Sequence, residues 1–131
     1  MIFVDTSDWY ASSSVRDANH EAAKRFLQSA PERLVTTDYV IDETLTLFRA
    51  RGENQHALTF GAEMIDGSFA EIRTIGSTDF AEAWNVFQTF ADKQRSFTDC
   101  TSRVVIDRLA SQRAMAFDDH FRQFGTVRVV P

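Results

Sequence analysis

Short apolar runs alternate along this chain with longer stretches in which apolar residues recur every three or four positions. The short runs predict strands at residues 2–4, 34–37, 71–75, 114–117 and 127–130. The longer stretches predict helices at residues 17–30, 38–51, 78–92 and 98–111, with another between Gly52 and residue 66. Because strands alternate with helices, the pattern indicates an α/β fold with a parallel sheet covered on both faces.

Polar and glycine residues mark where several of these helices begin and end. Asp17 is predicted to cap the first helix, while Gly52 and Gly67 are suited to the left-handed position that ends the next two. No linker, repeat or low-complexity tract divides the 131 residues. We therefore expect a single domain over residues 1–131.

Composition narrows the class of protein. The formal net charge is −5, from 14 Lys and Arg against 19 Asp and Glu, which argues against a general nucleic-acid binder. One cysteine, Cys100, excludes an intramolecular disulfide framework and fits a reducing compartment. No apolar run approaches the ~20 residues of a membrane span, and residues 1–5 do not resemble a signal peptide. We expect a cytoplasmic protein without membrane contact.

Carboxylates follow two of the predicted strands. Asp5 comes directly after the first strand, and Asp118 and Asp119 follow the strand at 114–117. In open α/β sheets the ligand crevice lies beyond the carboxyl ends of the strands, so these side chains are candidates to face one crevice. Turn formation or helix capping is the alternative explanation for each strand-end aspartate taken alone.

Two further carboxylates lie on predicted helices. Glu43 falls at the border of an apolar stripe, beside Val40 and Leu47, whereas Asp42 falls opposite the stripe and should face solvent. Asp99 lies in the first turn of the helix at 98–111, where a carboxylate is favoured by the helix dipole.

Hydroxyl side chains accompany these carboxylates. Ser96 or Thr98 is predicted to cap the helix that carries Asp99, and capping alone would also explain that aspartate. Thr6 and Ser7 follow Asp5 directly. We expect Thr6, Ser7 and Thr98 to support the candidate site.

A cluster of three or four carboxylates requires a cation, because like charges at close range disfavour ionisation. Oxygen ligands are those that Mg²⁺ and Mn²⁺ prefer. Zinc is not indicated, since His20, His56 and His120 are scattered and Cys100 stands alone. The sequence therefore predicts one or two Mg²⁺ or Mn²⁺ ions per site.

Four segments together resemble the PIN domain and, within it, the VapC-type toxins of prokaryotic toxin–antitoxin pairs. They are residues 3–11, 36–44, 96–100 and 117–121, and the resemblance extends over essentially the whole chain in order. It implies a three-layer sandwich around a five-stranded parallel sheet, with Asp5, Glu43, Asp99 and Asp118 as the acidic site. It also implies a metal-dependent endoribonuclease, an antitoxin partner and a homodimer.

The doubled Asp118 and Asp119 leave the fourth acidic ligand open. Asp118 is preferred because it follows the strand directly, and Asp119 is kept as an auxiliary ligand. Our hypothesis is that Asp5, Asp99 and one of these two hold the metal, while Glu43 orients or deprotonates the attacking water.

Arginine is the expected source of RNA contacts, because its planar guanidinium suits phosphate. Arg95 precedes the helix that carries Asp99, and Arg103 lies on that helix four residues after Asp99. Both are candidates for RNA binding. A solvated surface role is the alternative for each.

Homodimerisation is also expected from a surplus of large apolar side chains, which are Phe60, Met64, Phe87 and Phe90.

Two other functions remain as alternatives. One is a PIN-like binding module without catalysis, and the other is a phospho-acceptor signalling domain. The latter requires a lysine after a late strand, and the two lysines of the chain, Lys24 and Lys93, are not placed there.

Overall fold

A parallel sheet forms the centre of the molecule. The computed structural model describes residues 1–30, 32–109, 113–115 and 128–130. Its five strands are β1 (Ile2–Val4), β2 (Leu34–Thr37), β3 (Glu71–Arg73), β4 (Arg113–Met115) and β5 (Arg128–Val130). They are arranged in the order β3-β2-β1-β4-β5, and every neighbouring pair is parallel. The five strands predicted from the apolar runs are confirmed in number and order, and residues 116, 117 and 127 of the predicted strands lie outside the described residues.

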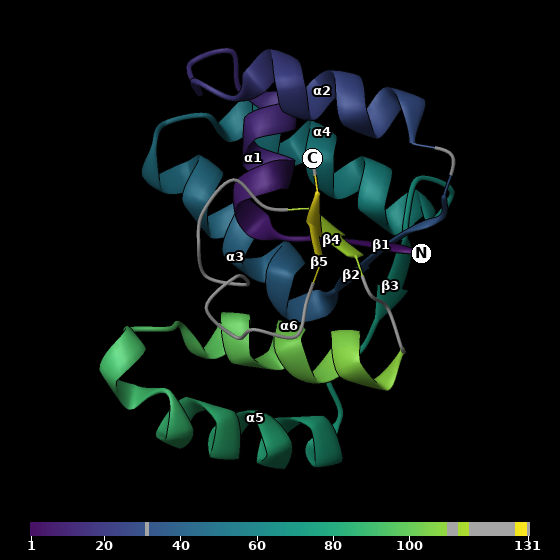
Figure 1. The fold of residues 1–131 in the computed structure, drawn as a ribbon. Coiled ribbons are helices and arrows are strands. Elements are labelled where there is room, and N and C mark those ends of the chain that lie inside the picture. The colour runs from purple at the N-terminus through teal and green to yellow at the C-terminus, as the bar shows by residue number, and fades with distance from the viewer. Residues whose placement is uncertain (31, 110–112, 116–127, 131) are drawn as a thin grey trace.

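Helices cover both faces of this sheet. They are α1 (Thr6–Ser13), α2 (His20–Ser29), α3 (Asp38–Ala50), α4 (Asn54–Asp66), α5 (Ser77–Thr89) and α6 (Phe97–Arg108), with a 3₁₀ turn, η1, at Ala91–Lys93. Figure 1 shows α1, α2 and α4 on one side of the sheet and the α5–α6 hairpin on the other. The predicted α/β sandwich is therefore confirmed. Within the described ranges, no helix is long and apolar enough to cross a membrane.

The α1 helix was not predicted from the apolar pattern. Buried positions lie around most of its circumference, because Thr6, Asp8, Trp9, Tyr10 and Ala11 are all buried. A helix that is buried on several sides has no single apolar stripe, so its sequence shows no helical repeat of apolar residues.

Two predicted boundaries were wrong for local reasons. Helix α2, which was predicted to begin after Asp17, begins at His20 with Asn19 as its N-cap. The Asp17 carboxylate instead accepts a hydrogen bond from the Asn19 N–H (2.8 Å). Strand β3 ends at Arg73 rather than residue 75. The Ile75 N–H leaves the sheet and donates to Oδ1 of Asp38 (2.9 Å), which ties the end of β3 to the start of α3.

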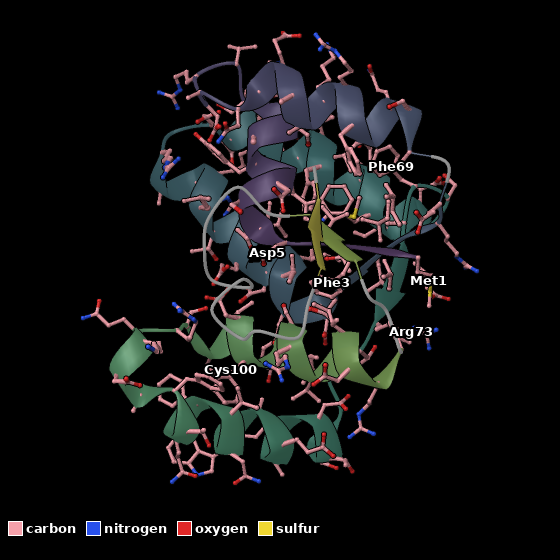
Figure 2. The ribbon with its side chains drawn as sticks, in the orientation of Figure 1. Met1, Phe3, Asp5, Phe69, Arg73 and Cys100 are labelled. Carbon is pink, nitrogen blue, oxygen red and sulfur yellow. The ribbon has the colours of Figure 1, made fainter. Side chains whose placement is uncertain are left out.

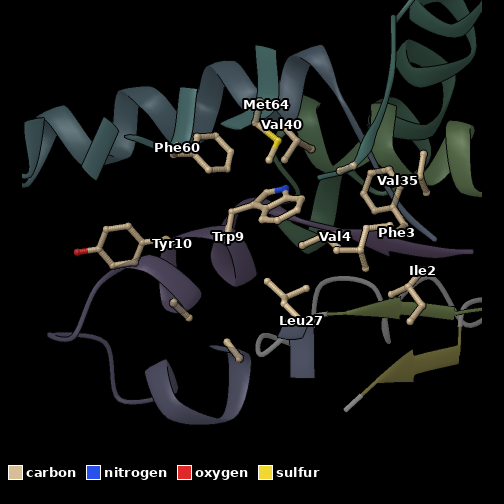
Figure 3. Close-up of a cluster of buried hydrophobic side chains, with 14 of the residues drawn as sticks. Ile2, Phe3, Val4, Trp9, Tyr10, Leu27, Val35, Val40, Phe60 and Met64 are labelled. Atoms are coloured by element: carbon tan, nitrogen blue, oxygen red, sulfur yellow. The ribbon is translucent and has the colours of Figure 1, made fainter. Parts of the chain in front are cut away.

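The main core packs the sheet against α1, α2, α3 and α4, and it also includes Val105 and Ile106 of α6. Trp9 is at its centre, with its ring 5.6 Å from that of Phe60 (Figure 3). The Trp9 indole N–H donates to Thr36 Oγ1 (3.2 Å), which in turn donates to the Val4 carbonyl (3.0 Å). These bonds satisfy polar atoms that would otherwise be costly to bury.

Two residues expected to be surplus to the core belong to it. Phe60 is 3% exposed and Met64 is 1% exposed, because α4 packs with both side chains inward. Of the four large apolar residues assigned to a dimer surface, only Phe87 is exposed, and Phe90 is half-buried. The argument for a dimer from Phe60 and Met64 was therefore wrong.

Candidate active site

A cavity of about 240 Å³ lies where α1, α3 and α6 approach one another. Its lining consists of three carboxylates, three hydroxyl side chains, one amide and one apolar residue: Asp5, Glu43, Asp99, Thr6, Ser7, Ser96, Gln94 and Leu47. Three of the four acidic residues predicted for the site therefore share one cavity. Figure 2 shows Asp5 above the helix that carries Cys100, the residue next to Asp99.

Asp5 is positioned by the junction of β1 and α1. It is the N-cap residue of α1, with an extended backbone, and its carbonyl accepts the Asp8 and Trp9 N–H groups (3.2 and 3.1 Å). Its side chain makes no capping bond to the helix, and Asp5 lines the cavity. At 3% exposure this carboxylate is well shielded from bulk water.

Glu43 reaches the cavity from the second turn of α3. The helix starts at Thr37, whose Oγ1 accepts the Val40 N–H (3.1 Å). Val40 is buried and Asp42 is exposed. The burial of Glu43 is intermediate between theirs. The border position predicted for Glu43 and the solvent position predicted for Asp42 are both confirmed.

Asp99 enters the cavity from the first turn of α6 and is 3% exposed. Ser96 caps this helix by accepting the Asp99 N–H (3.0 Å), which settles the choice between Ser96 and Thr98. Thr98 is half-buried, and its carbonyl accepts the Thr101 hydroxyl (2.6 Å). It is not among the residues that line the cavity, whereas Thr6 and Ser7 are.

The donor set of the cavity suits a hard cation and its water ligands. The Thr6 and Ser7 hydroxyl oxygens are buried and have no hydrogen-bond partner among the described residues. Buried hydroxyls usually have partners, so this pair is available to a water or a ligand oxygen. In residues 1–30, 32–109, 113–115 and 128–130, no three His, Cys, Asp or Glu side chains form a complete metal cluster. Asp5, Glu43 and Asp99 therefore share the cavity without forming such a cluster in this part of the chain.

Asp118 and Asp119 lie outside the described residues, as does His120. Strand β4 ends at Met115, which pairs with Val4, the residue before Asp5. The choice between Asp118 and Asp119 as the fourth acidic ligand therefore stays a prediction.

Cys100 lies beside Asp99 and is fully buried. Burial and the negative charge of Asp99 raise the pKa of its thiol to about 11, against the opposing effect of Arg95. The thiol is therefore neutral near pH 7 and behaves as a small core side chain.

The two arginines expected to bind RNA are not exposed on the surface. Arg95 is only 6% exposed, and its Nη1 donates to the Lys93 carbonyl (2.8 Å). Arg103 is half-buried and pairs with Asp107 one turn later (2.9 Å). RNA binding by these residues stays a prediction, and their positions favour structural roles.

Larger cavities exist elsewhere, but none of those described here groups three carboxylates among its described lining residues. One of about 570 Å³ lies between α3 and α4 and is lined mainly by apolar side chains, with no carboxylate among its described residues. Another of about 290 Å³ lies between α1, α2 and α4, with Glu63 as its one carboxylate among the described residues. The grouping of carboxylates, and not cavity size, makes the cavity at Asp5 the candidate site.

Residues 2–127 match the PIN domain family. The chain therefore belongs to this family, as the sequence resemblance predicted.

The chain is similar along its whole length to two endonucleases of Mycobacterium tuberculosis. Both are named 23S rRNA-specific endonuclease VapC20, one from strain CDC 1551 / Oshkosh and the other from strain ATCC 25618 / H37Rv. Identity is 34% over 131 residues, which covers 100% of this chain and 99% of each relative. Ribonuclease VapC26 of strain H37Rv is 22% identical over 129 residues, covering 98% of this chain and 93% of the relative.

A solved structure supports the fold directly. The crystal structure of Mycobacterium tuberculosis VapC20, described as a sarcin–ricin loop cleaving toxin, superposes with a TM-score of 0.92 at 32% identity. The match covers 100% of both chains.

Proposed function

We propose that this chain is a metal-dependent endoribonuclease that acts as the toxin of a toxin–antitoxin pair. The observation that carries the proposal is the cavity that groups Asp5, Glu43 and Asp99 in a PIN-family chain. Full-length similarity to relatives named as endonucleases and ribonucleases supports the same activity. This agrees with the function predicted from the sequence.

Asp5 and Asp99, together with Asp118 or Asp119, would hold one or two Mg²⁺ or Mn²⁺ ions. The described donors that line the cavity are mainly carboxylate and hydroxyl oxygens, which such hard cations prefer. A bound ion of this kind lowers the pKa of water and neutralises charge on the phosphate. Its presence also allows neighbouring carboxylates to remain ionised together.

Glu43 is the proposed general base. It accepts a proton from the attacking water, whose oxygen forms a bond to phosphorus while the bond from phosphorus to the 3′ oxygen breaks. The departing 3′ oxygen takes up a proton from solvent. The Thr6 and Ser7 hydroxyls donate hydrogen bonds to phosphate oxygens. Because water attacks and the bond to the 3′ oxygen breaks, the products carry a 5′-phosphate and a 3′-hydroxyl.

Ribosomal RNA is the proposed substrate class. Support comes from the printed names of the relatives, which specify 23S rRNA and the sarcin–ricin loop. The net charge of −5 opposes general binding to RNA, so recognition should depend on contacts close to the cavity.

An antitoxin and a second copy of the chain are the proposed protein partners. The antitoxin would block the cavity by directing a basic side chain toward its carboxylates. A homodimer is supported by α5, where Phe80, Trp84 and Phe87 are exposed and the Trp84 and Phe87 rings stack at 5.8 Å. A cytoplasmic location stays a prediction.

The test is cleavage of ribosomal RNA by the purified chain. Wild type is incubated with intact 23S rRNA and with a sarcin–ricin loop oligonucleotide, in Mg²⁺, in Mn²⁺ and in EDTA, and RNA ends are sequenced. We expect cleavage at one position, 5′-phosphate ends and no cleavage in EDTA. Asp118→Asn and Asp119→Asn are compared in parallel, and we expect the larger loss from Asp118→Asn.

Other results of this experiment would favour one of the two alternative functions or a different reaction chemistry. RNA binding without cleavage under any metal condition would identify a silent binding module. Products with 2′,3′-cyclic phosphates would exclude attack by water. Formation of an acid-labile phosphoaspartate from a small phosphodonor, without RNA cleavage, would identify a phospho-acceptor domain.

A further inference from the structure

Gln94 has an unusual backbone conformation at the edge of the cavity. Its φ is 54° and its ψ is 41°, which is the left-handed region. It is the one non-glycine residue with positive φ in the described ranges, where the others are Gly52 and Gly67. The left-handed conformation costs about 1–2 kcal/mol for a residue with a side chain, and glycine or asparagine would adopt it more easily.

Neighbouring residues hold this conformation in place. On one side, the Lys93 N–H closes the 3₁₀ turn by donating to the Phe90 carbonyl (2.9 Å), and the Lys93 carbonyl accepts from buried Arg95 (2.8 Å). On the other side, Ser96 caps α6 through the Asp99 N–H (3.0 Å). Gln94 itself is exposed and lines the cavity. Strained residues that are held in this way cluster at functional sites.

The side chain of Gln94 adds an amide donor to a cavity whose other side-chain donors are the hydroxyls of Thr6, Ser7 and Ser96. Carboxylates accept hydrogen bonds only, and Leu47 offers none. Among the described residues that line the cavity, Gln94 carries the only side-chain nitrogen donor. An RNA phosphodiester is anionic and presents acceptor oxygens, so an amide N–H₂ at the edge of an acidic cavity is complementary to it.

We propose that Gln94 is a substrate-binding residue whose side-chain amide donates hydrogen bonds to the RNA phosphodiester at the cavity. The inference rests on the proposed endoribonuclease function and adds a contact on the substrate side. It explains why glutamine, rather than glycine, occupies a left-handed position.

Three substitutions at Gln94 separate the amide from the backbone conformation. Gln94→Gly removes the amide and retains easy access to the left-handed region. Gln94→Asn retains an amide and tolerates this region, and Gln94→Glu replaces the donor with a further carboxylate. Gln88→Ala is the matched control, because Gln88 is exposed on α5 and does not line the cavity. Cleavage kinetics on an RNA oligonucleotide and thermal unfolding are measured for all four.

Gln94→Gly should raise KM about tenfold, the effect of one hydrogen bond to a charged group, with kcat within about twofold of wild type. Gln94→Asn should recover part of this loss, and Gln94→Glu should raise KM further than Gln94→Gly. The thermal stability of Gln94→Gly should equal or exceed that of wild type, and Gln88→Ala should match wild type in every measurement.

The results that would overturn the Gln94 inference differ from those that would overturn the proposed function. If wild type cleaves RNA and Gln94→Gly has an unchanged KM, the inference is wrong and the proposed function stands. A fall in kcat alone, with equal loss in Gln94→Asn and Gln94→Gly, would assign Gln94 a purely structural role and also overturn the inference. A wild-type chain that cleaves no RNA would overturn both.

Discussion

Two buried carboxylate sites, one at Glu53 and one at Asp5 and Asp99, have different surroundings. Glu53 accepts hydrogen bonds from the Tyr10 hydroxyl and the Arg16 guanidinium, and His56 Nδ1 lies 2.9 Å from its Oε2. Asp5 and Asp99 instead line a cavity together with another carboxylate and several hydroxyls. The Glu53 site joins one carboxylate to Tyr10 and Arg16, whereas the cavity groups Asp5 and Asp99 with a third carboxylate.

We infer from this difference that Glu53 has a structural role, in contrast to the proposed functional role of the cavity carboxylates. Burial alone would raise the pKa of Glu53, but hydrogen bonds from Tyr10 and Arg16 lower it to about 2. Glu53 therefore stabilises the fold by joining α1 to the α3–α4 connection. A cavity that gathers several carboxylates gains little stability from them, which is typical of sites organised for a ligand.

The largest expected effect is on catalysis. Asp99→Asn should reduce the rate of RNA cleavage by about 100-fold or more, because it removes a charge that we propose binds the metal and that is then worth several kcal/mol in the transition state. Its free energy of unfolding is measured beside the rate, so that a loss of activity in a folded variant is distinguished from loss of the fold. Single-turnover cleavage and urea unfolding measure the two quantities, and a stable variant with full activity would remove Asp99 from the site.

Glu53→Gln should show the reverse pattern. The substitution removes the charge that accepts from Tyr10 and Arg16, so we expect the free energy of unfolding to fall by about 2 kcal/mol. Solvent at the exposed Arg16 side chain screens part of the ion pair and limits the loss. RNA cleavage at a temperature where the variant remains folded should stay within about twofold of wild type. A large loss of kcat there would show that the two carboxylate groups are coupled.

The pH dependence of the free energy of unfolding tests the structural role of Glu53. Because the pKa of Glu53 is lowered from 4.5 to about 2 on folding, its ionised form stabilises the native state above pH 4.5. This contribution is lost as the pH falls from 4.5 toward 2. The difference in unfolding free energy between wild type and Glu53→Gln should therefore be constant from pH 7 to 5 and shrink below 4.5. A difference that stays constant down to pH 3 would contradict this assignment.

The smallest effects concern two helix caps. Ser96→Ala and Thr37→Ala each remove a side-chain acceptor at a helix start, of α6 and α3 respectively, and each should cost about 1 kcal/mol of stability. Ser96 holds the N–H of Asp99 itself, so only Ser96→Ala should also lower kcat, by a few-fold. Equal kcat in the two variants would show that the cap does not orient the Asp99 carboxylate.

Much of the candidate site was accessible from the sequence because its residues occupy positions with local signals. Asp5 follows an apolar run, Glu43 lies at the border of an apolar stripe, and Asp99 begins a helix. Each signal depends on residues within one helical turn of the position, and the fold then brings the three side chains to one cavity.

Other features depend on tertiary packing and were inaccessible. The left-handed backbone of Gln94 is set by contacts on both sides of it, and burial of Arg95 cannot be inferred from a charged residue in a polar segment. Trp9 and its helix carry no amphipathic period, because α1 is buried on most sides. The deep position of Phe60 likewise follows from how α4 packs against the core.

The most direct test of the central claim is the rate of RNA cleavage as a function of Mn²⁺ concentration, measured for wild type, Asp99→Asn and Glu53→Gln. We predict a saturable increase for wild type and Glu53→Gln with the same half-saturating concentration. Asp99→Asn should require a much higher Mn²⁺ concentration or fail to respond. A wild-type rate that is independent of Mn²⁺ and unaffected by EDTA, or an Asp99→Asn response identical to that of wild type, would contradict a metal-dependent site at these carboxylates.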